Sequence, residues 1–197
     1  MDWVYIVRHG ATPWNEQRRF QGQQDVGLNT RGFEQARRLA QLGRPPGEIR
    51  IVASDLARAH QTALTLAEGW GTQVEAVDPR FRETNAGSWE GRTFEELGPE
   101  LARWRTDPYL RPGGGETRVE VGARVVAGIS DHMRPGRALI VVTHGGASRA
   151  AIGTQLRWDP HDWEQQEVLG NCHWTRLSLE SGTWQLHEHN SSTSMSQ

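Results

Sequence analysis

Short apolar-rich runs alternate along this chain with longer segments in which apolar residues recur at helical spacing. The short runs predict strands at residues 4–7, 49–53, 73–77 and 138–143. Helical spacing predicts helices over residues 30–42, from the capping residues Ser54 and Asp55 to about Trp70, near 94–104, over 117–133 and over 147–156. A turn at Ser181 and Gly182 predicts a hairpin of strands 174–179 and 183–187.

This order of elements places the chain in the α/β class. Strands that alternate with helices of ten or more residues build βαβ units, which form a mainly parallel sheet with helices on both faces. We therefore expect one domain over residues 1–189. Within it, the less regular residues 84–116 are expected as an insertion over the carboxyl edge of the sheet. The polar residues 190–197 predict a disordered tail.

Composition and charge narrow the range of partners. The 197 residues carry a formal charge of −2, which gives no electrostatic reason to expect nucleic acid or an anionic membrane. No apolar run approaches the roughly 20 residues of a membrane span, and the first strand begins too early for a signal peptide. The single cysteine, Cys172, excludes an intramolecular disulfide and is expected to be a packed residue. These features predict a cytoplasmic protein. They do not decide its oligomeric state, and a homodimer is possible.

Two of the predicted strands end on histidine. The first continues into Arg8 and His9, and the fourth continues into His144 followed by two glycines. In open α/β sheets, ligands bind at the carboxyl ends of the strands, so neighbouring strands would bring both histidines into one pocket. Arg58 lies in the first turn of the helix after the second strand and points to the same edge. Because guanidinium groups match phosphate oxygens, the sequence favours an anion site over an exposed basic loop.

Four sequence blocks resemble one known family. In order they are Arg8-His9-Gly10-x-Thr12-x-x-Asn15, Ser54-Asp55-Leu56-x-Arg58-Ala59-x-x-Thr62-Ala63, Arg82-Glu83-x-x-x-Gly87-x-Trp89-Glu90-Gly91 and Thr143-His144-Gly145-Gly146. Their succession resembles the histidine phosphatase superfamily in its phosphoglycerate-mutase-like branch. The resemblance spans residues 4 to about 180 and implies a three-layer α/β/α sandwich with a mainly parallel central sheet.

By that resemblance, His9 is the nucleophile that becomes phosphorylated on its ring. A neutral imidazole attacks an anionic phosphorus, so nearby cations must offset the repulsion and hold the phosphoryl oxygens in line. The clamp of the family corresponds to Arg8, Arg58 and His144. A phosphohistidine divides the transfer into two displacements.

Other residues complete the implied site. Further phosphate-binding candidates are neutral groups: Asn15, Gln21 and the backbone amide of Gly145. Glu83 matches the acid/base of the family, which gives a proton to the leaving oxygen and then takes one from the attacking water. The alternative for Glu83 is a salt bridge to Arg80 or Arg82. Trp89 and Glu90 are expected to brace the segment under Glu83.

The sequence predicts neither a metal nor a cofactor. His187 and His189 could face one way on a strand and hold a metal, but two isolated histidines there are more typical of a solvent-exposed strand. The chain departs from the family at Ala11, where an acidic residue is common, and at residues 27–29, which read Gly-Leu-Asn in place of Pro-Leu-Thr. Neither departure touches the expected phosphate clamp, so both concern loop shape and substrate choice.

The sequence favours a phosphomonoesterase over a phosphoglycerate mutase. Mutases of the branch usually carry a longer segment after the glutamate motif, which closes the site against water, and the span between Glu83 and residues 113–115 is modest here. Residues 114–119 and 170–178 resemble glucosyl-3-phosphoglycerate phosphatases, so we expect a small phosphorylated metabolite of the sugar phosphate or phosphoglycerate type. Alpha-ribazole phosphatase and broad-specificity phosphatase are alternative activities that the sequence does not exclude. A non-catalytic phosphate-binding module is the alternative of another class, and it is disfavoured because all the catalytic residue types are present.

Overall fold

A six-stranded sheet forms the centre of the computed structural model, which describes residues 2–195. The strands lie in the order β3-β2-β4-β1-β5-β6. Their bounds are β1 Asp2–Arg8, β2 Glu48–Ala53, β3 Val74–Val77, β4 Arg137–Thr143, β5 Trp174–Glu180 and β6 Thr183–Ser191. The first four are parallel to their neighbours, whereas β5 and β6 add an antiparallel hairpin beside β1. The predicted, mainly parallel sheet is confirmed.

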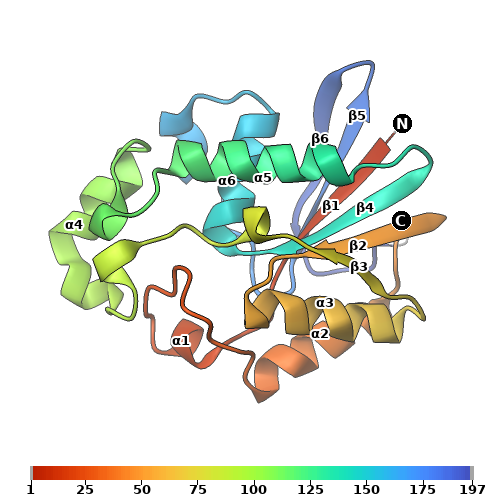
Figure 1. Cartoon of the computed structure of the whole chain (residues 1–197), viewed down its shortest axis with the longest axis horizontal. Coiled ribbons are helices and arrows are strands. Elements are labelled where there is room, and N and C mark those ends of the chain that lie inside the picture. Colours follow the sequence, from red (N-terminus) through yellow and green to blue (C-terminus); the bar gives the residue numbers. More distant parts are fainter. Residues whose placement is uncertain (1, 196–197) are drawn as a thin grey trace.

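Helices cover both faces of this sheet (Figure 1). The main helices are α2 Thr30–Leu42, α3 Ala57–Gly69, α5 Arg118–His132 and α6 Gly145–Gln155. Alternation along β1 shows how the layers form, because successive side chains of a strand point to opposite faces. Tyr5 and Val7 pack in the core under α2 and α3, while Val4 and Ile6 pack in the core under α5 and α6. The result is the three-layer α/β/α sandwich that the sequence predicted.

The remaining elements are short or lie beyond the sheet. They are α1 Pro13–Glu16, α4 Phe94–Thr106 and the 3₁₀ turns η1 Pro79–Phe81, η2 Gly87–Trp89, η3 Pro112–Gly114 and η4 Pro160–Gln165. Figure 1 shows α1 and α4 beyond the carboxyl ends of the parallel strands. A separate aromatic and aliphatic cluster, which includes Phe20, Trp89 and Leu97, anchors this region. The segment after Glu83 therefore forms a wall over the carboxyl edge.

The register between β1 and β4 brings the two motif histidines together. Arg8 pairs with Thr143, and the His9 amide donates to the Thr143 carbonyl over 3.0 Å. His144 follows directly as the residue that caps the start of α6. The prediction that the two strands are neighbours is confirmed, so the carboxyl ends of both strands can contribute residues to one pocket.

Two local expectations differ from the structure. The helix after β2 has Leu56 as its N-cap residue rather than Ser54 or Asp55, whose side chains bond His144 and Arg82. The tail expected to be disordered from Asn190 is ordered through Met195, whose side chain is fully buried in the core. The remaining part of that tail, residues 196–197, lies outside the described residues. Within the described chain, no helix is long and apolar enough to cross a membrane.

Candidate active site

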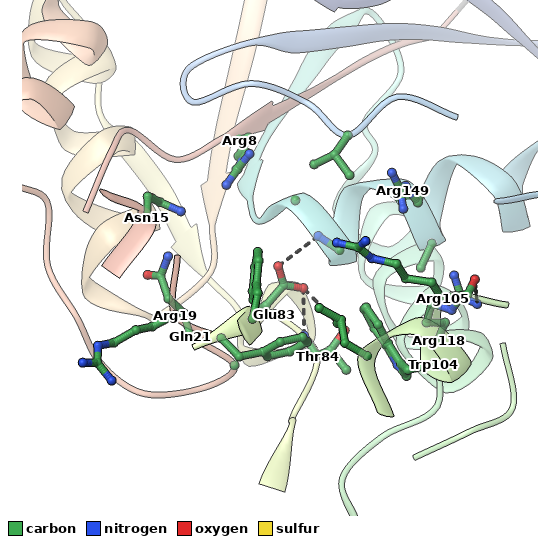
Figure 2. Close-up of a pocket in the computed structure, with 18 of the residues that line it drawn as sticks. Arg8, Asn15, Arg19, Gln21, Glu83, Thr84, Trp104, Arg105, Arg118 and Arg149 are labelled. Carbon is green, nitrogen blue, oxygen red and sulfur yellow. Dashed lines mark hydrogen bonds between the residues drawn. The ribbon is translucent and has the colours of Figure 1, made fainter. Parts of the chain in front are cut away.

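A cavity of about 480 Å³ opens at the carboxyl ends of β1 and β4. We divide the cavity into two parts. The histidine end is the part lined by Arg8, His9 and Arg58, and the arginine end is the part lined by three further arginines. Those further cations are Arg105, Arg118 and Arg149. Figure 2 shows Glu83 between Arg8 on one side and the three arginines on the other. The predicted nucleophile and acid/base therefore share one cavity.

His9 is held as a neutral imidazole. Its ring is buried, and Nδ1 lies 2.7 Å from the carbonyl oxygen of Gly10. A carbonyl only accepts hydrogen bonds, so Nδ1 carries the proton and Nε2 keeps its lone pair. Burial, together with the charges of Arg58 and Arg8, lowers the pKa of His9 well below its ordinary value. The ring nitrogen that faces away from Gly10 can thus act as a nucleophile at neutral pH.

Arg58 is fully buried and fixed by the loop that follows α1. Its Nη2 donates to the Gly22 carbonyl over 2.7 Å, and its Nη1 donates to the Gln24 carbonyl over 2.8 Å. Burial lowers the pKa of Arg58 to about 10, so the guanidinium keeps its charge at neutral pH. Because neutral carbonyls hold it, its positive charge is not cancelled and stays available to an anionic ligand.

Arg8 is the second cation of the histidine end. Its Nη1 donates to the Leu169 carbonyl over 2.6 Å, and its buried Nε has no hydrogen-bond partner among the described residues. A buried donor without a partner is costly, so Arg8 is prepared for an incoming acceptor.

His144 lies beside His9 but does not line the cavity. The two ring centroids are 5.2 Å apart. Its Nδ1 accepts from Arg58 Nε over 3.1 Å, which leaves Nε2 to donate to the Ser54 hydroxyl over 3.0 Å. Burial and the charge of Arg58 lower the pKa of His144 well below its ordinary value. In this arrangement His144 orients Arg58, and its predicted direct contact with phosphate stays a prediction.

Glu83 sits against the first turn of α6. The Gly146 amide donates to Oε2 over 2.9 Å, and the Ala147 and Thr84 amides each donate to Oε1 over 2.9 Å. Helix N-termini favour negative charge, so this position holds the carboxylate firmly at the cavity wall. Both oxygens accept from amides, so the structure shows Glu83 as a carboxylate, the form that can take a proton from a group in the cavity.

The alternative role of Glu83, a structural salt bridge, is not what the structure shows. Arg80 pairs with Asp78 and Asp131, and Arg82 pairs with Asp55 over 2.5 Å. These pairs occupy both arginines that could have bound Glu83. The carboxylate therefore remains a wall of the cavity.

Asn15 and Gln21 line the histidine end, as expected. The Asn15 side-chain oxygen accepts from the Thr12 amide over 3.0 Å, and the Gln21 side-chain oxygen accepts from the Thr12 hydroxyl over 3.0 Å. Both amide oxygens are thus in use, which leaves the amide nitrogens as donors to a ligand. Gly145 also lines the cavity, at the first residue of α6.

Comparison with known sequences identifies the family. The sequence profile of the histidine phosphatase superfamily (branch 1) matches residues 4–192. The chain belongs to this superfamily. A Yersinia enterocolitica protein named probable phosphoglycerate mutase is 37% identical over 188 residues, or 92% of this chain and 86% of that protein.

Solved structures of this superfamily share the fold. Mycobacterial glucosyl-3-phosphoglycerate phosphatase, in complex with VO3, is 34% identical with a TM-score of 0.86 over 95% of this chain and 98% of that chain. A His-to-Ala mutant of phosphoserine phosphatase from Entamoeba histolytica, in complex with phosphoserine, is 27% identical with a TM-score of 0.83 over 98% of each chain. The family, the sandwich fold and the enzyme class predicted from the sequence are confirmed.

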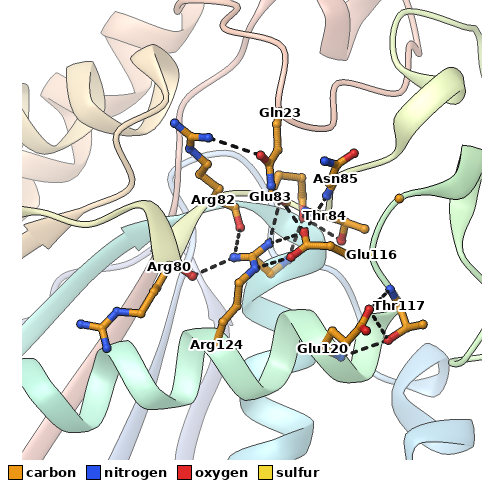
Figure 3. Close-up of polar contacts among 12 residues, drawn as sticks. Gln23, Arg80, Arg82, Glu83, Thr84, Asn85, Glu116, Thr117, Glu120 and Arg124 are labelled. Carbon is orange, nitrogen blue, oxygen red and sulfur yellow. Dashed lines mark hydrogen bonds and ion pairs between the residues drawn. The ribbon is translucent and has the colours of Figure 1, made fainter.

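Arg124 of α5 supports the backbone on either side of Glu83, the predicted acid/base, from behind (Figure 3). Its guanidinium donates to the Arg80, Arg82 and Glu83 carbonyls over 2.7, 2.7 and 2.9 Å. It also pairs with Glu116, with 2.8 Å between Nε and Oε1. Burial raises the pKa of Glu116, but the hydrogen bonds from the Arg124 side chain and the Asn85 amide, together with the charge of Arg124, outweigh burial, so the pKa of Glu116 lies below its ordinary value.

Sequence reasoning missed this support. In the sequence, Glu116 lies within a segment that resembles sugar phosphatases, and no motif singles out Arg124. The Glu116 Oε2 atom also accepts from the Asn85 amide over 2.9 Å, so one ion pair fixes both sides of Glu83. Arg124 is only eight residues from Glu116, but the backbone groups that this pair holds, the Asn85 amide and the carbonyls of residues 80, 82 and 83, lie 31 to 44 residues away in the sequence.

The proposed brace under Glu83 agrees with the contacts. Glu90 Oε1 accepts from the Gln23 amide over 2.8 Å and from the Ala86 amide over 3.1 Å. Trp89 packs edge to face with Phe20. Neither Trp89 nor Glu90 lines the cavity, so their contacts fix the loop rather than the ligand.

The remaining candidates lie elsewhere. His187 bonds the Ser178 hydroxyl over 2.8 Å, and His189 bonds the Thr175 hydroxyl over 2.9 Å. Among the residues that the structure describes, no group of three or more His, Cys, Asp or Glu side chains could hold a metal ion. Burial raises the pKa of the Cys172 thiol to about 12, which suits the packed role predicted for it.

Proposed function

We propose that this histidine phosphatase is a phosphomonoesterase that acts through a phosphohistidine on His9. One observation carries the proposal: a buried, neutral imidazole with a free Nε2 lies beside two guanidinium groups that backbone carbonyls hold. Arg8 and Arg58 then offset the charge of the phosphoryl group during attack. The mechanism uses these fixed cations and requires no metal.

In the first displacement, the Nε2 atom of His9 forms a bond to phosphorus as the ester P–O bond breaks. Glu83 gives its proton to the leaving oxygen, so the alcohol departs neutral. In the second displacement, water attacks the phosphohistidine and gives its proton to Glu83. The P–N bond breaks, inorganic phosphate leaves, and both residues return to their starting states.

We propose a small phosphorylated metabolite of the sugar phosphate or phosphoglycerate type as the substrate. The named relatives support this range, because they include a glucosyl-3-phosphoglycerate phosphatase and a phosphoserine phosphatase. A phosphoglycerate mutase is the second candidate. It is favoured by the 37% identity to a protein named probable phosphoglycerate mutase.

A phosphate-release screen over sugar phosphates, phosphoglycerates and p-nitrophenyl phosphate tests the proposal, with and without a chelator. We expect turnover of at least one monoester and no loss on chelation. If no monoester is hydrolysed, the phosphatase function is wrong, and if the chelator abolishes activity, the metal-free mechanism is wrong. Conversion between phosphoglycerate isomers that is faster than phosphate release would identify a mutase.

A further inference from the structure

The peptide group that joins Gly10 to Ala11 contacts the nucleophile directly. Its carbonyl oxygen, on Gly10, lies 2.7 Å from Nδ1 of His9 and accepts the proton there. Its amide, on Ala11, donates to the side-chain oxygen of Gln35 over 2.8 Å. A chain of two hydrogen bonds therefore runs from the His9 ring through one peptide group to Gln35, a residue that does not line the cavity.

The start of α2 places Gln35 against this peptide group. Gly32 and Gln35 are three residues apart, so they lie on the same face of α2. Gly32 packs so closely on the Ala11 backbone that a Cβ on it would overlap the Ala11 carbonyl oxygen. Asn29, the N-cap residue of α2, donates its backbone amide to the same oxygen over 3.0 Å. The helix is therefore docked on residue 11 and carries Gln35 to the Ala11 amide.

The position of Gln35 gives its hydrogen bond two effects. Ala11 is only 3% exposed, so its amide needs an acceptor whatever the state of His9. In addition, hydrogen bonds in series polarise one another, because an acceptor on the amide makes the carbonyl of the same peptide group a stronger acceptor. That carbonyl binds the Nδ1 proton of His9, so Gln35 strengthens the bond that orients the ring and raises the electron density on Nε2.

The surroundings of His9 make this bond important. Burial and the charges of Arg58 from α3 and Arg8 from β1 lower the pKa of His9, whereas the hydrogen bond to Gly10 raises it. The ring of His144, at the start of α6, lies 5.2 Å away between centroids. Among the described residues, the Gly10 carbonyl is the one hydrogen-bond partner of the His9 ring. The basicity that the ring needs for attack on phosphorus therefore depends on this single acceptor.

We propose that Gln35 is a positioning residue for the nucleophile: by accepting from the Ala11 amide, it holds and polarises the peptide group whose carbonyl orients the His9 ring. The inference rests on the proposed phosphatase function, in which Nε2 of His9 attacks phosphorus. Gln35 does not line the cavity, so its effect reaches the reaction through His9. Substitution of Gln35 should therefore slow formation of the phosphohistidine and leave phosphate binding unchanged.

Three substitutions at one position test this role. Gln35→Met keeps the length of the side chain without its acceptor, Gln35→Asn keeps the acceptor on a shorter side chain, and Gln35→Glu keeps both. Stopped-flow absorbance with p-nitrophenyl phosphate, whose leaving group needs no proton, measures the rate constant of the burst. We expect Gln35→Met and Gln35→Asn to lower this rate constant roughly tenfold, and Gln35→Glu to retain it. The competitive inhibition constant of inorganic phosphate should stay near its original value in all three variants.

The control lies on the same helix. Gln41 is an exposed residue of α2, so Gln41→Met should change neither the burst nor the inhibition by phosphate. A burst rate constant that is unchanged in Gln35→Met and Gln35→Asn would overturn the proposal. Equal losses of burst rate and of phosphate affinity would also overturn it, because they would show that Gln35 only maintains the shape of the cavity.

Proton NMR of the His9 Nδ1–H resonance makes the test independent of turnover. Labelling with ¹⁵N-histidine reveals this proton, and its absence from the spectrum of His9→Gln assigns it. Because a stronger hydrogen bond moves the resonance downfield, Gln35→Glu should move it downfield, and Gln35→Met should move it upfield. Thr62→Val is the comparison, because the Thr62 hydroxyl accepts from the Gly10 amide over 3.0 Å, in the neighbouring peptide group, which does not bind the ring. It should shift the resonance much less.

The two measurements separate this inference from the proposed function. A His9 Nδ1–H resonance that responds to none of the Gln35 substitutions would overturn the inference and leave the phosphatase function intact. Failure of the unsubstituted protein to hydrolyse any monoester would instead refute the phosphatase function, and the NMR measurement would still test the hydrogen-bond chain. Gln35→Glu keeps the acceptor of the Ala11 amide, so its downfield shift decides the question even if Gln35→Met does not fold.

Discussion

The two ends of the cavity hold their cations in different ways. At the histidine end, Arg8 and Arg58 donate to backbone carbonyls, which fix a guanidinium without cancelling its charge. At the arginine end, Arg118 and Arg149 share the Glu164 carboxylate, which cancels part of their charge. The difference shows that the guanidinium charges of the histidine end stay available to an anionic ligand, whereas those of the arginine end are partly cancelled within the protein.

The largest effect is expected when the proposed nucleophile of the histidine end is removed. His9→Ala should lower phosphate release by at least about 10⁴-fold, because no other described residue of the histidine end offers a free imidazole nitrogen. Rapid-quench labelling with a ³²P-ester measures phosphoenzyme formation in parallel. His161→Ala is the control, since His161 is exposed and does not line the cavity. Labelling that survives in His9→Ala would show that the nucleophile is assigned wrongly.

The acid/base is the next test, because it lies between the two ends. Glu83→Gln should lower the steady-state rate on an alkyl phosphate by about 10²–10⁴-fold, since neither the alkoxide nor the water finds its proton partner. With p-nitrophenyl phosphate, the first burst of nitrophenolate should persist, because this leaving group needs no proton. Stopped-flow absorbance measures the burst. Loss of the burst to the same degree as the alkyl phosphate rate would contradict the acid role.

Substitution of Arg124, which supports Glu83, should have a smaller effect than substitution of Glu83 but the same dependence on the leaving group. Arg124→Gln removes the donors to the Arg80, Arg82 and Glu83 carbonyls. We expect a loss of about 10- to 100-fold on alkyl phosphates and a smaller loss of the p-nitrophenyl phosphate burst.

The matched control for this substitution is Arg111→Gln, which removes an exposed ion pair with Glu120 and should change neither rate. Thermal unfolding shows whether the Arg124 variant is folded. Equal losses on both substrates would mean that Arg124 stabilises the fold without positioning the acid.

The smallest expected effect concerns stability and pH. Burial keeps the folded-state pKa values of His9 and His144 well below those of the unfolded chain. Between the folded value and about pH 6.5 the unfolded chain binds more protons, so the free energy of unfolding falls as the pH drops. Each histidine contributes up to about 2 kcal/mol of this loss between pH 6.5 and 5.

Urea unfolding at pH 7, 6 and 5 measures this slope. His9→Gln should reduce the slope by about the contribution of one histidine. His161→Gln, at an exposed position, should leave the slope unchanged. A free energy of unfolding that is constant from pH 7 to 5 would contradict the neutral, buried state of both rings.

The histidine end could be predicted from the sequence because its signals are local. The apolar runs of β1 and β4 are buried on both faces, and each ends directly on its histidine. The start of α3 could not be placed in this way. Ser54 and Asp55 have the composition of a helix cap, but His144 and Arg82 engage their side chains from far along the chain.

The arginine end was not predictable for the same reason. Its three arginines lie on three helices, with no spacing that links them, and only the packing of α4, α5 and α6 brings them to one cavity. The ordered residues 190–195 show that a polar composition alone does not predict disorder. Residues 190–195 are polar apart from Met195, and that one side chain is fully buried.

The contact between Glu83 and the first turn of α6 gives this protein an internal reporter. The amides of Gly146 and Ala147 donate to the same carboxyl group that carries the proton in the proposed cycle. Each gain or loss of that proton must change these two amides, and their NMR resonances would record it without any label on the substrate.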